Sequence, residues 1–123
     1  MTLTQTPTQA PTVTWVPVCQ LADITPDRGV AALVGDDQVA IFLLSPVGDA
    51  PGEIYAVGNH DPYSGANVIA RGLVGSAGDR PIVASPIYKE RFDLRDGTCL
   101  DGDLSIRTWP VRIADGWVEI GQT

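Results

Sequence analysis

The apolar residues of this chain alternate with polar ones over short runs, and Gly, Asp and Pro interrupt those runs. Alternation with a period of two is typical of strands that bury one face, whereas a helix would require a 3.6-residue period over several turns. No segment keeps that longer period. The pattern therefore restricts the chain to short strands joined by turns, and we predict an all-β protein.

The first half of the sequence predicts three strands. The first covers residues 14–19, with Pro17 at an edge position or a bulge, because proline cannot donate to a strand ladder. Residues 30–34 and 38–44 flank Gly35-Asp36-Asp37, which predicts a hairpin. Residues 39–44 are apolar on both faces, which indicates a central strand covered on both sides, or one that closes a small barrel.

The second half predicts shorter strands and one closing hairpin. The short strands are expected at residues 53–57, 73–75 and 82–85. Residues 109–120 should form the hairpin, turning at Asp115-Gly116. Its core-facing side chains are expected to be Val111, Ile113, Val118 and Ile120.

With 123 residues, the chain has room for one domain with a single core. Residues 1–13 contain Thr, Gln and Pro but no charged residue, so we expect a disordered tail, followed by the domain at 14–123. Within the domain, residues 58–102 are rich in Gly, Pro and Asp, which predicts a loop-rich insertion on the β scaffold. Binding chemistry tends to lie in such loops.

The net charge of −7 argues against a nucleic-acid partner, because binding to phosphate backbones depends on clustered Lys and Arg. All basic residues except Arg28 follow position 60. They could pair with an acidic patch on a partner protein, or form ordinary solvated surface. We find no secretory signal and no apolar run long enough to span a membrane, so a cytoplasmic protein is expected.

Cys19 and Cys99 lie far apart in the sequence, and we expect both to be reduced, buried or half-buried thiols. Two cysteines are too few for a disulfide framework or a four-thiolate cluster. The Asp residues at 93, 96, 101 and 103 lack the spacing of a calcium loop, and we interpret Asp96-Gly97 and Asp101-Gly102 as turns. His60 is the only histidine, and nothing around it predicts a nucleophile triad.

Two segments resemble the cluster-binding loops of Rieske [2Fe-2S] proteins. The first is 55–66 (YAVGNHDPYSGA), and the second is 84–99 (ASPIYKERFDLRDGTC). The loop frame is kept, with Asn59, Pro62, Gly65 and Ala66 in the first loop and Pro86, Phe92, Asp93, Gly97 and Cys99 in the second. The resemblance implies a Rieske-like β barrel or sandwich with a smaller inserted β subdomain at 58–102.

The four ligand positions of the Rieske pattern are changed. Asp61 and Tyr63 occupy the Cys-x-His positions of the first loop, and Ser85 and Tyr88 occupy the Cys-x-x-His positions of the second. A Rieske centre needs two thiolates on one iron and two imidazoles on the other. Carboxylate, phenol and hydroxyl oxygens are hard ligands that suit such a cluster poorly. We therefore expect no iron–sulfur cluster and no other metal in this chain.

A Rieske frame without its ligands is similar to the small subunit of assimilatory NAD(P)H-dependent nitrite reductases. Residues 72–76, 85–89 and 100–102 also resemble that subunit. The resemblance implies a role in nitrate assimilation beside a large oxidoreductase subunit, which would carry FAD, sirohaem and an iron–sulfur cluster and reduce nitrite to ammonia. The isolated chain is not expected to be catalytic. The alternatives are an electron carrier with an atypical metal centre and a free-standing β binding module.

The same resemblance predicts how the two loops are arranged. Their tips should lie side by side, with the Tyr63 and Tyr88 rings stacked across the cluster position and their hydroxyls directed towards Asp61 or Ser85. The tip would then be the docking face for the large subunit. Its candidate interface residues are His60, Pro62, Tyr63, Ile87, Tyr88, Lys89 and Glu90. Alternatively, the tyrosines only fill the cluster site and the partner binds elsewhere.

Overall fold

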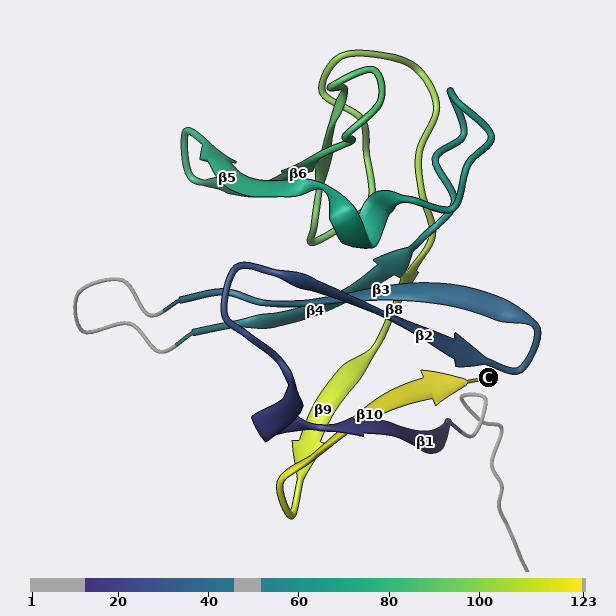
Figure 1. The fold of residues 1–123 in the computed structure, drawn as a ribbon, viewed down its shortest axis with the longest axis vertical. Coiled ribbons are helices and arrows are strands. Elements are labelled where there is room, and N and C mark those ends of the chain that lie inside the picture. Colours follow the sequence, from purple (N-terminus) through teal and green to yellow (C-terminus); the bar gives the residue numbers. More distant parts are fainter. Residues whose placement is uncertain (1–12, 46–51, 123) are drawn as a thin grey trace, which may run out of the picture.

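The computed structural model describes residues 13–45 and 52–122, and in these residues the regular elements are ten strands and two short 3₁₀ helices. The strands form three antiparallel sheets, in the orders β1-β10-β9, β2-β3-β4-β8 and β5-β6-β7 (Figure 1). The all-β prediction is confirmed. Within the part of the chain that is described, no helix is long and apolar enough to cross a membrane.

The observed bounds of the strands agree closely with the predicted bounds in the first half of the chain and less closely in the second half. The strands are β1 (Thr14–Gln20), β2 (Gly29–Val34), β3 (Asp37–Leu43), β4 (Ile54–Gly58), β5 (Leu73–Ala77), β6 (Arg80–Ala84), β7 (Arg91–Asp93), β8 (Thr108–Trp109), β9 (Val111–Ala114) and β10 (Trp117–Gln122). The 3₁₀ helices are η2 (Leu21–Asp23) and η3 (Ile69–Arg71). The short strand β7 was not predicted. The predicted tail at 1–13 lies outside the described residues except for Val13.

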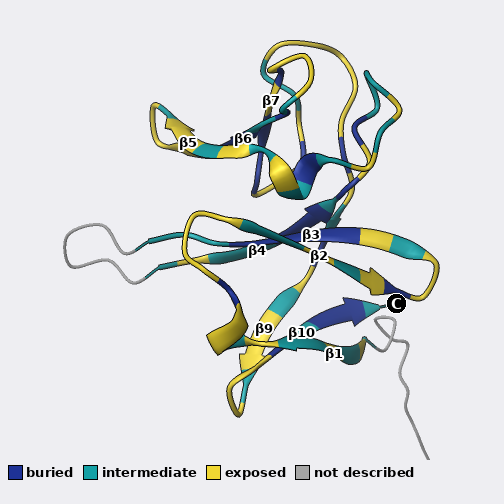
Figure 2. Ribbon diagram, in the orientation of Figure 1, coloured by how far each residue is buried: buried dark blue, intermediate teal, exposed yellow. Residues whose placement is uncertain are grey.

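Strand β3 separates two hydrophobic cores, as its doubly apolar sequence predicts. Val39 and Ile41 belong to the core shared with the β1-β10-β9 sheet, where they pack with Val118 and Ile120. Alternate residues of β3 belong to a second core, formed with Ile69 and the third sheet. The buried stretch of β3 therefore lies between the lower sheet and the upper group of loops (Figure 2). The prediction of a central strand is confirmed.

Both predicted features of the outer strands are also present. Strand β1 lies at the edge of its sheet, and its register with β10 shifts between Pro17 and Cys19, which is the expected bulge. The β2–β3 hairpin turns at Gly35-Asp36, since Asp37 already pairs with Val34. Thr14 at the start of β1 pairs with Gln122 at the end of β10, so the two strands run together along their whole length.

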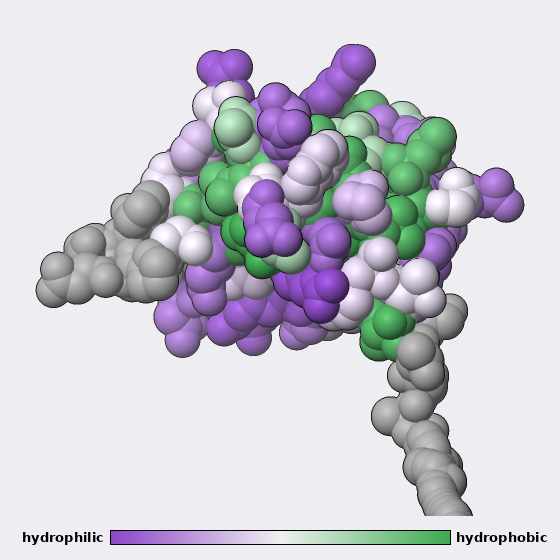
Figure 3. Space-filling model, turned by 90° about the horizontal axis from the view of Figure 1, so that it is seen from below, coloured by the Kyte–Doolittle hydropathy of each residue, from purple (hydrophilic) through white to green (hydrophobic). Residues whose placement is uncertain are grey.

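The closing hairpin forms, but one of its four predicted core residues is not buried. Val118 and Ile120 are fully buried and Val111 packs against the same core, whereas Ile113 is 45% exposed. Ile113 pairs with Val118, but it lies on β9, the edge strand of its sheet, one residue before the hairpin strand ends. Viewed from below, the surface at this end of the molecule mixes hydrophobic and hydrophilic side chains (Figure 3). The predicted burial of Ile113 is therefore wrong.

The second and third sheets position the two predicted loops. Strand β4 leads into loop 1, which we define as residues 58–67, and β6 leads into loop 2, residues 85–90, before β7 returns. Both loops lie on the upper side of the third sheet in Figure 1, away from the β1-β10-β9 sheet. A third segment, residues 100–105 (loop 3), runs past them towards β8.

A pair of matched substitutions tests this assignment of the hairpin. Ile120→Ala should lower the free energy of unfolding by ~2–5 kcal/mol, because it leaves a cavity in the core. Ile113→Ala should cost less than ~1 kcal/mol, because the side chain is already half in water. Urea denaturation of both variants measures the difference. Equal losses at the two positions would contradict the assignment of Ile113 to the exposed edge.

Candidate functional site

Loop 1 is anchored at its base by a buried asparagine. The Asn59 side-chain oxygen accepts a hydrogen bond from the Ala70 amide at 2.7 Å, and its amide nitrogen donates to the Gln38 side chain at 3.3 Å. These contacts connect the loop to η3 and β3. Further along, the Gly65 amide donates to the Asp61 carbonyl at 2.8 Å and Gly65 adopts a positive φ of 80°, which closes the loop as a turn.

Loop 2 is a tight turn closed by its own backbone. The Ser85 amide donates to the Glu90 carbonyl at 2.9 Å, and the Lys89 amide donates to the Ser85 carbonyl at 3.1 Å. Lys89 has a φ of 67°, a left-handed conformation that a residue other than glycine rarely adopts. Ser85 and Glu90 are therefore held side by side at the base of the turn, while Ile87, Tyr88 and Lys89 project from it.

A direct hydrogen bond joins the two loops where a Rieske protein has its two cysteines. The Ser85 hydroxyl donates to Asp61 Oδ2 at 2.6 Å, and both side chains are fully buried. Asp61 Oδ1 accepts from the Tyr63 amide at 2.9 Å, which fixes the carboxylate in its own loop. We call the Ser85–Asp61 bond the loop clamp. Hydrogen bonds to a charged group contribute about 1.5–3 kcal/mol each.

Glu90 is the third polar member of this cluster. Its side chain is 8% exposed, its carboxyl lies in hydrogen-bonding reach of Asp61, and its Oε1 has no partner among the described residues. Burial and the neighbouring Asp61 carboxylate raise the pKa of Glu90 above its usual 4.5. Burial alone would raise the pKa of Asp61, but the hydrogen bonds from Ser85 and the Tyr63 amide lower it below 3.8. Of the two carboxyl groups, Glu90 is therefore the one that keeps its proton to the higher pH.

Tyr63 does not stack on Tyr88. Its ring lies against Phe92, with ring centroids 6.2 Å apart and a tilt of 39°, and its hydroxyl accepts a hydrogen bond from the Leu104 amide at 2.9 Å. The tyrosine therefore connects loop 1 to loop 3, and Gly102 gives it room, since a Cβ at that position would collide with the Tyr63 hydroxyl. Tyr88 is 64% exposed. The predicted stack, with hydroxyls towards Asp61 or Ser85, is wrong.

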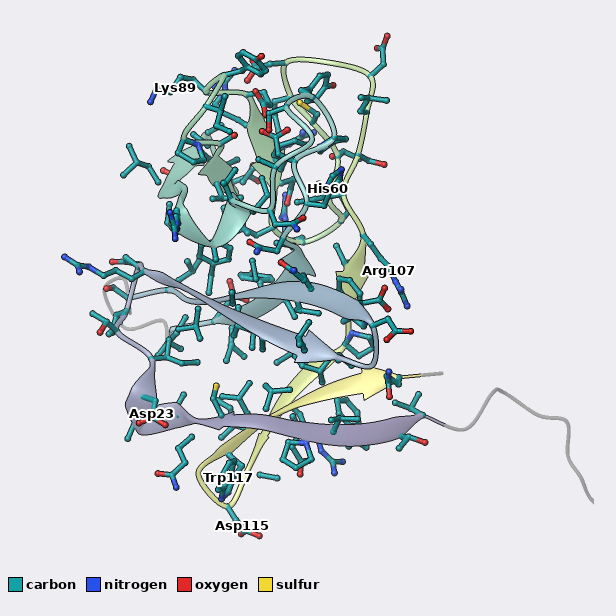
Figure 4. All side chains as sticks on the ribbon, turned by 45° about the vertical axis from the view of Figure 1, so that its right-hand side comes forward. Asp23, His60, Lys89, Arg107, Asp115 and Trp117 are labelled. Atoms are coloured by element: carbon teal, nitrogen blue, oxygen red, sulfur yellow. The ribbon has the colours of Figure 1, made fainter. Side chains whose placement is uncertain are left out.

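Together, loops 1, 2 and 3 form the tip of the molecule. Of the predicted interface residues, Ile87 is 42% exposed, and His60, Tyr88 and Lys89 also face solvent. His60 lies in the upper part of the molecule (Figure 4). Its Nδ1 lies 3.1 Å from the Asn67 side-chain oxygen, so the ring is tied to its own loop. Leu104 on loop 3, at 46% exposed, was missed by the sequence interpretation. An apolar residue directly between Asp103 and Ser105 was the available signal.

A hollow of about 410 Å³ opens at the tip between the loops. Its lining residues are Tyr63, Tyr88, Lys89, Glu90 and Asp101. Glu90 is the buried member, and the others are partly or largely exposed. The hollow thus combines two phenol rings with two carboxyl groups and one amine. Its position beside the loop clamp brings together residues from all three loops.

Most basic residues in the second half already have partners within the chain. Five arginines form ion pairs: Arg80 and Arg95 with Asp93, Arg91 with Asp101, Arg107 with Asp37, and Arg112 with Glu119. Arg107 and Arg112 also lie over the rings of Trp109 and Trp15, each 4.3 Å from the ring centroid. These arginines are therefore engaged internally rather than gathered into a surface for an acidic partner.

The side chains at the four ligand positions do not fit a [2Fe-2S] cluster. Asp61 and Ser85 are hydrogen-bonded to each other, the Tyr63 hydroxyl binds Leu104, and Tyr88 points into solvent. This set offers neither thiolate nor imidazole. Across residues 13–45 and 52–122, no three His, Cys, Asp or Glu side chains converge in a metal-binding group. Cys19 and Cys99 are free and half-buried, as expected.

The fold and sequence have clear relatives. The Rieske-like [2Fe-2S] domain family matches residues 14–121. The Escherichia coli K12 nitrite reductase (NADH) small subunit is 39% identical over 107 residues, which cover 86% of this chain and 95% of that protein. The crystal structure of a Mycobacterium tuberculosis NADH-dependent nitrite reductase small subunit has a TM-score of 0.83 at 40% identity, covering 92% of this chain and 98% of that one.

One relative contains the domain inside a much longer polypeptide. The Klebsiella oxytoca nitrite reductase [NAD(P)H] large subunit is 43% identical over 112 residues, which cover 90% of this chain. The chain spans only 11% of the length of that protein. The same kind of domain thus occurs both as a separate small protein and as part of a large subunit.

The raised pKa of Glu90 makes the stability of the tip depend on pH. A carboxyl whose pKa rises on folding contributes stability that is complete below its unfolded pKa, near 4.5, and is lost as the pH rises through the raised value. The wild-type free energy of unfolding should therefore fall as the pH rises above 4.5, and Glu90→Gln, which cannot ionise, should remove this slope. Asp61 acts with the opposite sign, since its contribution is lost as the pH falls below 3.8.

Urea denaturation between about pH 5 and 8 measures the slope for the wild type and for Glu90→Gln. Glu53→Gln, which changes an exposed carboxylate outside the tip, is the matched control and should keep the wild-type slope. If Glu90→Gln also keeps that slope, Glu90 does not hold the proton of the pair.

Proposed function

The chain belongs to the Rieske-like family, among the small subunits of NAD(P)H nitrite reductase, and we propose that it serves there as a subunit without a cluster of its own. The Rieske-like fold and the resemblance to these subunits, both predicted from the sequence, are confirmed. In the proposed role the chain binds the large subunit of the oxidoreductase, which reduces nitrite to ammonia and holds FAD, sirohaem and an iron–sulfur cluster. We place the complex in the cytoplasm, where reduced nicotinamides are supplied.

The observation that carries this proposal is the loop clamp. In a Rieske protein the two loops are held together by their shared metal ligands. Here the Ser85–Asp61 hydrogen bond joins the same two positions, with Glu90 beside them. Residues 58–102 would then be a former cluster-binding subdomain whose loops stay ordered through hydrogen bonds. Such a subdomain can still present a defined surface, but it cannot carry an electron through these side chains.

The proposed partner surface is the tip. The Klebsiella relative, in which this kind of domain lies within a large-subunit polypeptide, supports a partner of that class. At the tip, Ile87, Tyr88 and Leu104 expose large apolar or aromatic side chains next to charged ones, a composition typical of interface cores. Tyr88 offers wide contact area at low entropic cost, since only two side-chain torsions must be fixed.

Metal analysis separates this proposal from an electron carrier with an atypical centre. We expect the full chain, purified anaerobically, to contain iron and acid-labile sulfide far below stoichiometric amounts, because the four ligand positions hold no thiolate or imidazole. Two controls for the procedure are reconstituted in parallel. One is a Rieske ferredoxin, and the other is a variant of this chain that combines Asp61→Cys, Tyr63→His, Ser85→Cys and Tyr88→His. Stoichiometric iron and sulfide in the wild-type chain would overturn the proposal.

Docking at the tip is tested by one aromatic substitution and its counterpart at the other end. Tyr88→Ala should weaken binding to the large subunit by about tenfold or more while the thermal melt stays unchanged. Trp117→Ala removes a comparably exposed aromatic at the opposite end of the molecule and should leave binding intact (Figure 4). Calorimetry of the two purified subunits measures both. A lowered melt with intact binding would show that Tyr88 only packs at the tip and that the partner binds elsewhere.

A further inference from the structure

The hollow at the tip has the features of a receptor for a positively charged group. Two of its lining residues, Tyr63 and Tyr88, present aromatic rings from loops 1 and 2. The negative faces of such rings attract cations, most strongly where water is partly excluded. Glu90 lies between them as the buried member of the lining, and Asp101 completes the acidic part.

The Asp61–Glu90 carboxyl pair beneath the hollow has no cationic side chain as an ion-pair partner among the described residues. Asp101 is neutralised by Arg91, whose guanidinium meets the Asp101 carboxylate at 2.8 and 2.9 Å. By contrast, none of the ion pairs of the described residues involves Asp61 or Glu90. Glu90 Oε1 is buried without a hydrogen-bond partner. Buried carboxyl oxygens normally have a hydrogen-bond partner or a cation in contact, so Glu90 is an exception that a bound cation would complete.

Lys89, the amine that lines the hollow, is engaged in its own loop. Its Nζ donates to the Pro86 carbonyl at 3.2 Å, a bond within the loop 2 turn. Lys89 is exposed, and its left-handed backbone carries the side chain at the outer end of the tip (Figure 4). The amine is therefore a positive charge at the rim, which would repel a second cation rather than attract it.

We propose that the hollow receives a basic side chain of the docking partner, an arginine or a lysine, held against the rings of Tyr63 and Tyr88 above the Asp61–Glu90 pair. This inference rests on the proposed docking at the tip and names the chemistry that the partner presents there. It differs from the alternative of an acidic partner patch, because five arginines of the second half are already paired within the chain.

Peptide titrations test the charge preference without the large subunit. The isotopically labelled full chain is titrated by NMR with acetyl-Gly-Arg-Gly-amide, the corresponding Lys peptide, a citrulline peptide of the same shape without charge, and a Glu peptide. The Arg and Lys peptides should shift the amides of Tyr63, Tyr88 and Glu90. The citrulline and Glu peptides should not. Tyr88→Leu keeps apolar bulk but removes the ring, and it should lower the affinity for the Arg peptide by about two- to fivefold.

Lys89 provides a test in which the sign of the effect decides. Lys89→Gln removes the positive charge at the rim. It should therefore raise the affinity of the chain for both the Arg peptide and the large subunit. Arg71→Gln removes an exposed charge from η3, which packs against β2 and β3, and controls for the change in net charge. We expect Arg71→Gln to leave both affinities unchanged.

The possible failures are distinguishable. If the large subunit does not bind the wild-type chain at all, the proposed function falls. If it binds, but Lys89→Gln weakens the complex or the citrulline peptide binds as well as the Arg peptide, only the basic-side-chain receptor is overturned. Tightening by Lys89→Gln together with shifts confined to the Arg and Lys peptides supports it.

Discussion

A single buried hydrogen bond, from the Ser85 hydroxyl to the Asp61 carboxylate, determines how the upper part of this protein is arranged. It fixes loop 2 against loop 1, and Tyr63, two residues along from Asp61, then reaches loop 3 through the Leu104 amide. The Glu90 carboxyl is buried in the same cluster, and its pKa is raised there. Because an unpaired carboxylate in this position would be strongly destabilising, all three members depend on one another.

In the proposed role, hydrogen bonds stand where a Rieske protein has metal ligands, and this changes what the loops can do. A cluster holds its loops rigidly and exchanges electrons, whereas the Ser85–Asp61 hydrogen bond holds them without a redox-active group. The family relation therefore preserves a shape and a surface more than a chemistry. The arginines follow the same logic, since Arg91, Arg95 and Arg107 strengthen the framework around the tip through internal ion pairs.

Sequence patterns predicted what is local and missed what is long-range. The doubly apolar run of β3 and the Gly35-Asp36 turn follow from neighbouring residues, and both were predicted. Ile113 was misplaced because periodicity assigns a face but does not say how far the opposite sheet extends over it. Tyr63 was misplaced because its partner, Leu104, is 41 residues away and is reached through the backbone amide, which no side-chain pattern records. The resemblance to Rieske loops singled out Asp61 and Ser85 as former ligand positions, but it did not predict the hydrogen bond between them.

The pairing of Thr14 with Gln122 has a consequence for assembly. A polypeptide that continues from the start of β1 or from the end of β10 leaves the domain at the same end of the β1-β10-β9 sheet, which is the sheet farthest from the tip (Figure 1). A linker joined there acts as a tether that raises the effective concentration of the tip near a covalently attached partner without covering it. This geometry allows one domain to serve both as a diffusing subunit and as a segment of a longer enzyme. In the second case, weak contacts between the tip and its partner are sufficient.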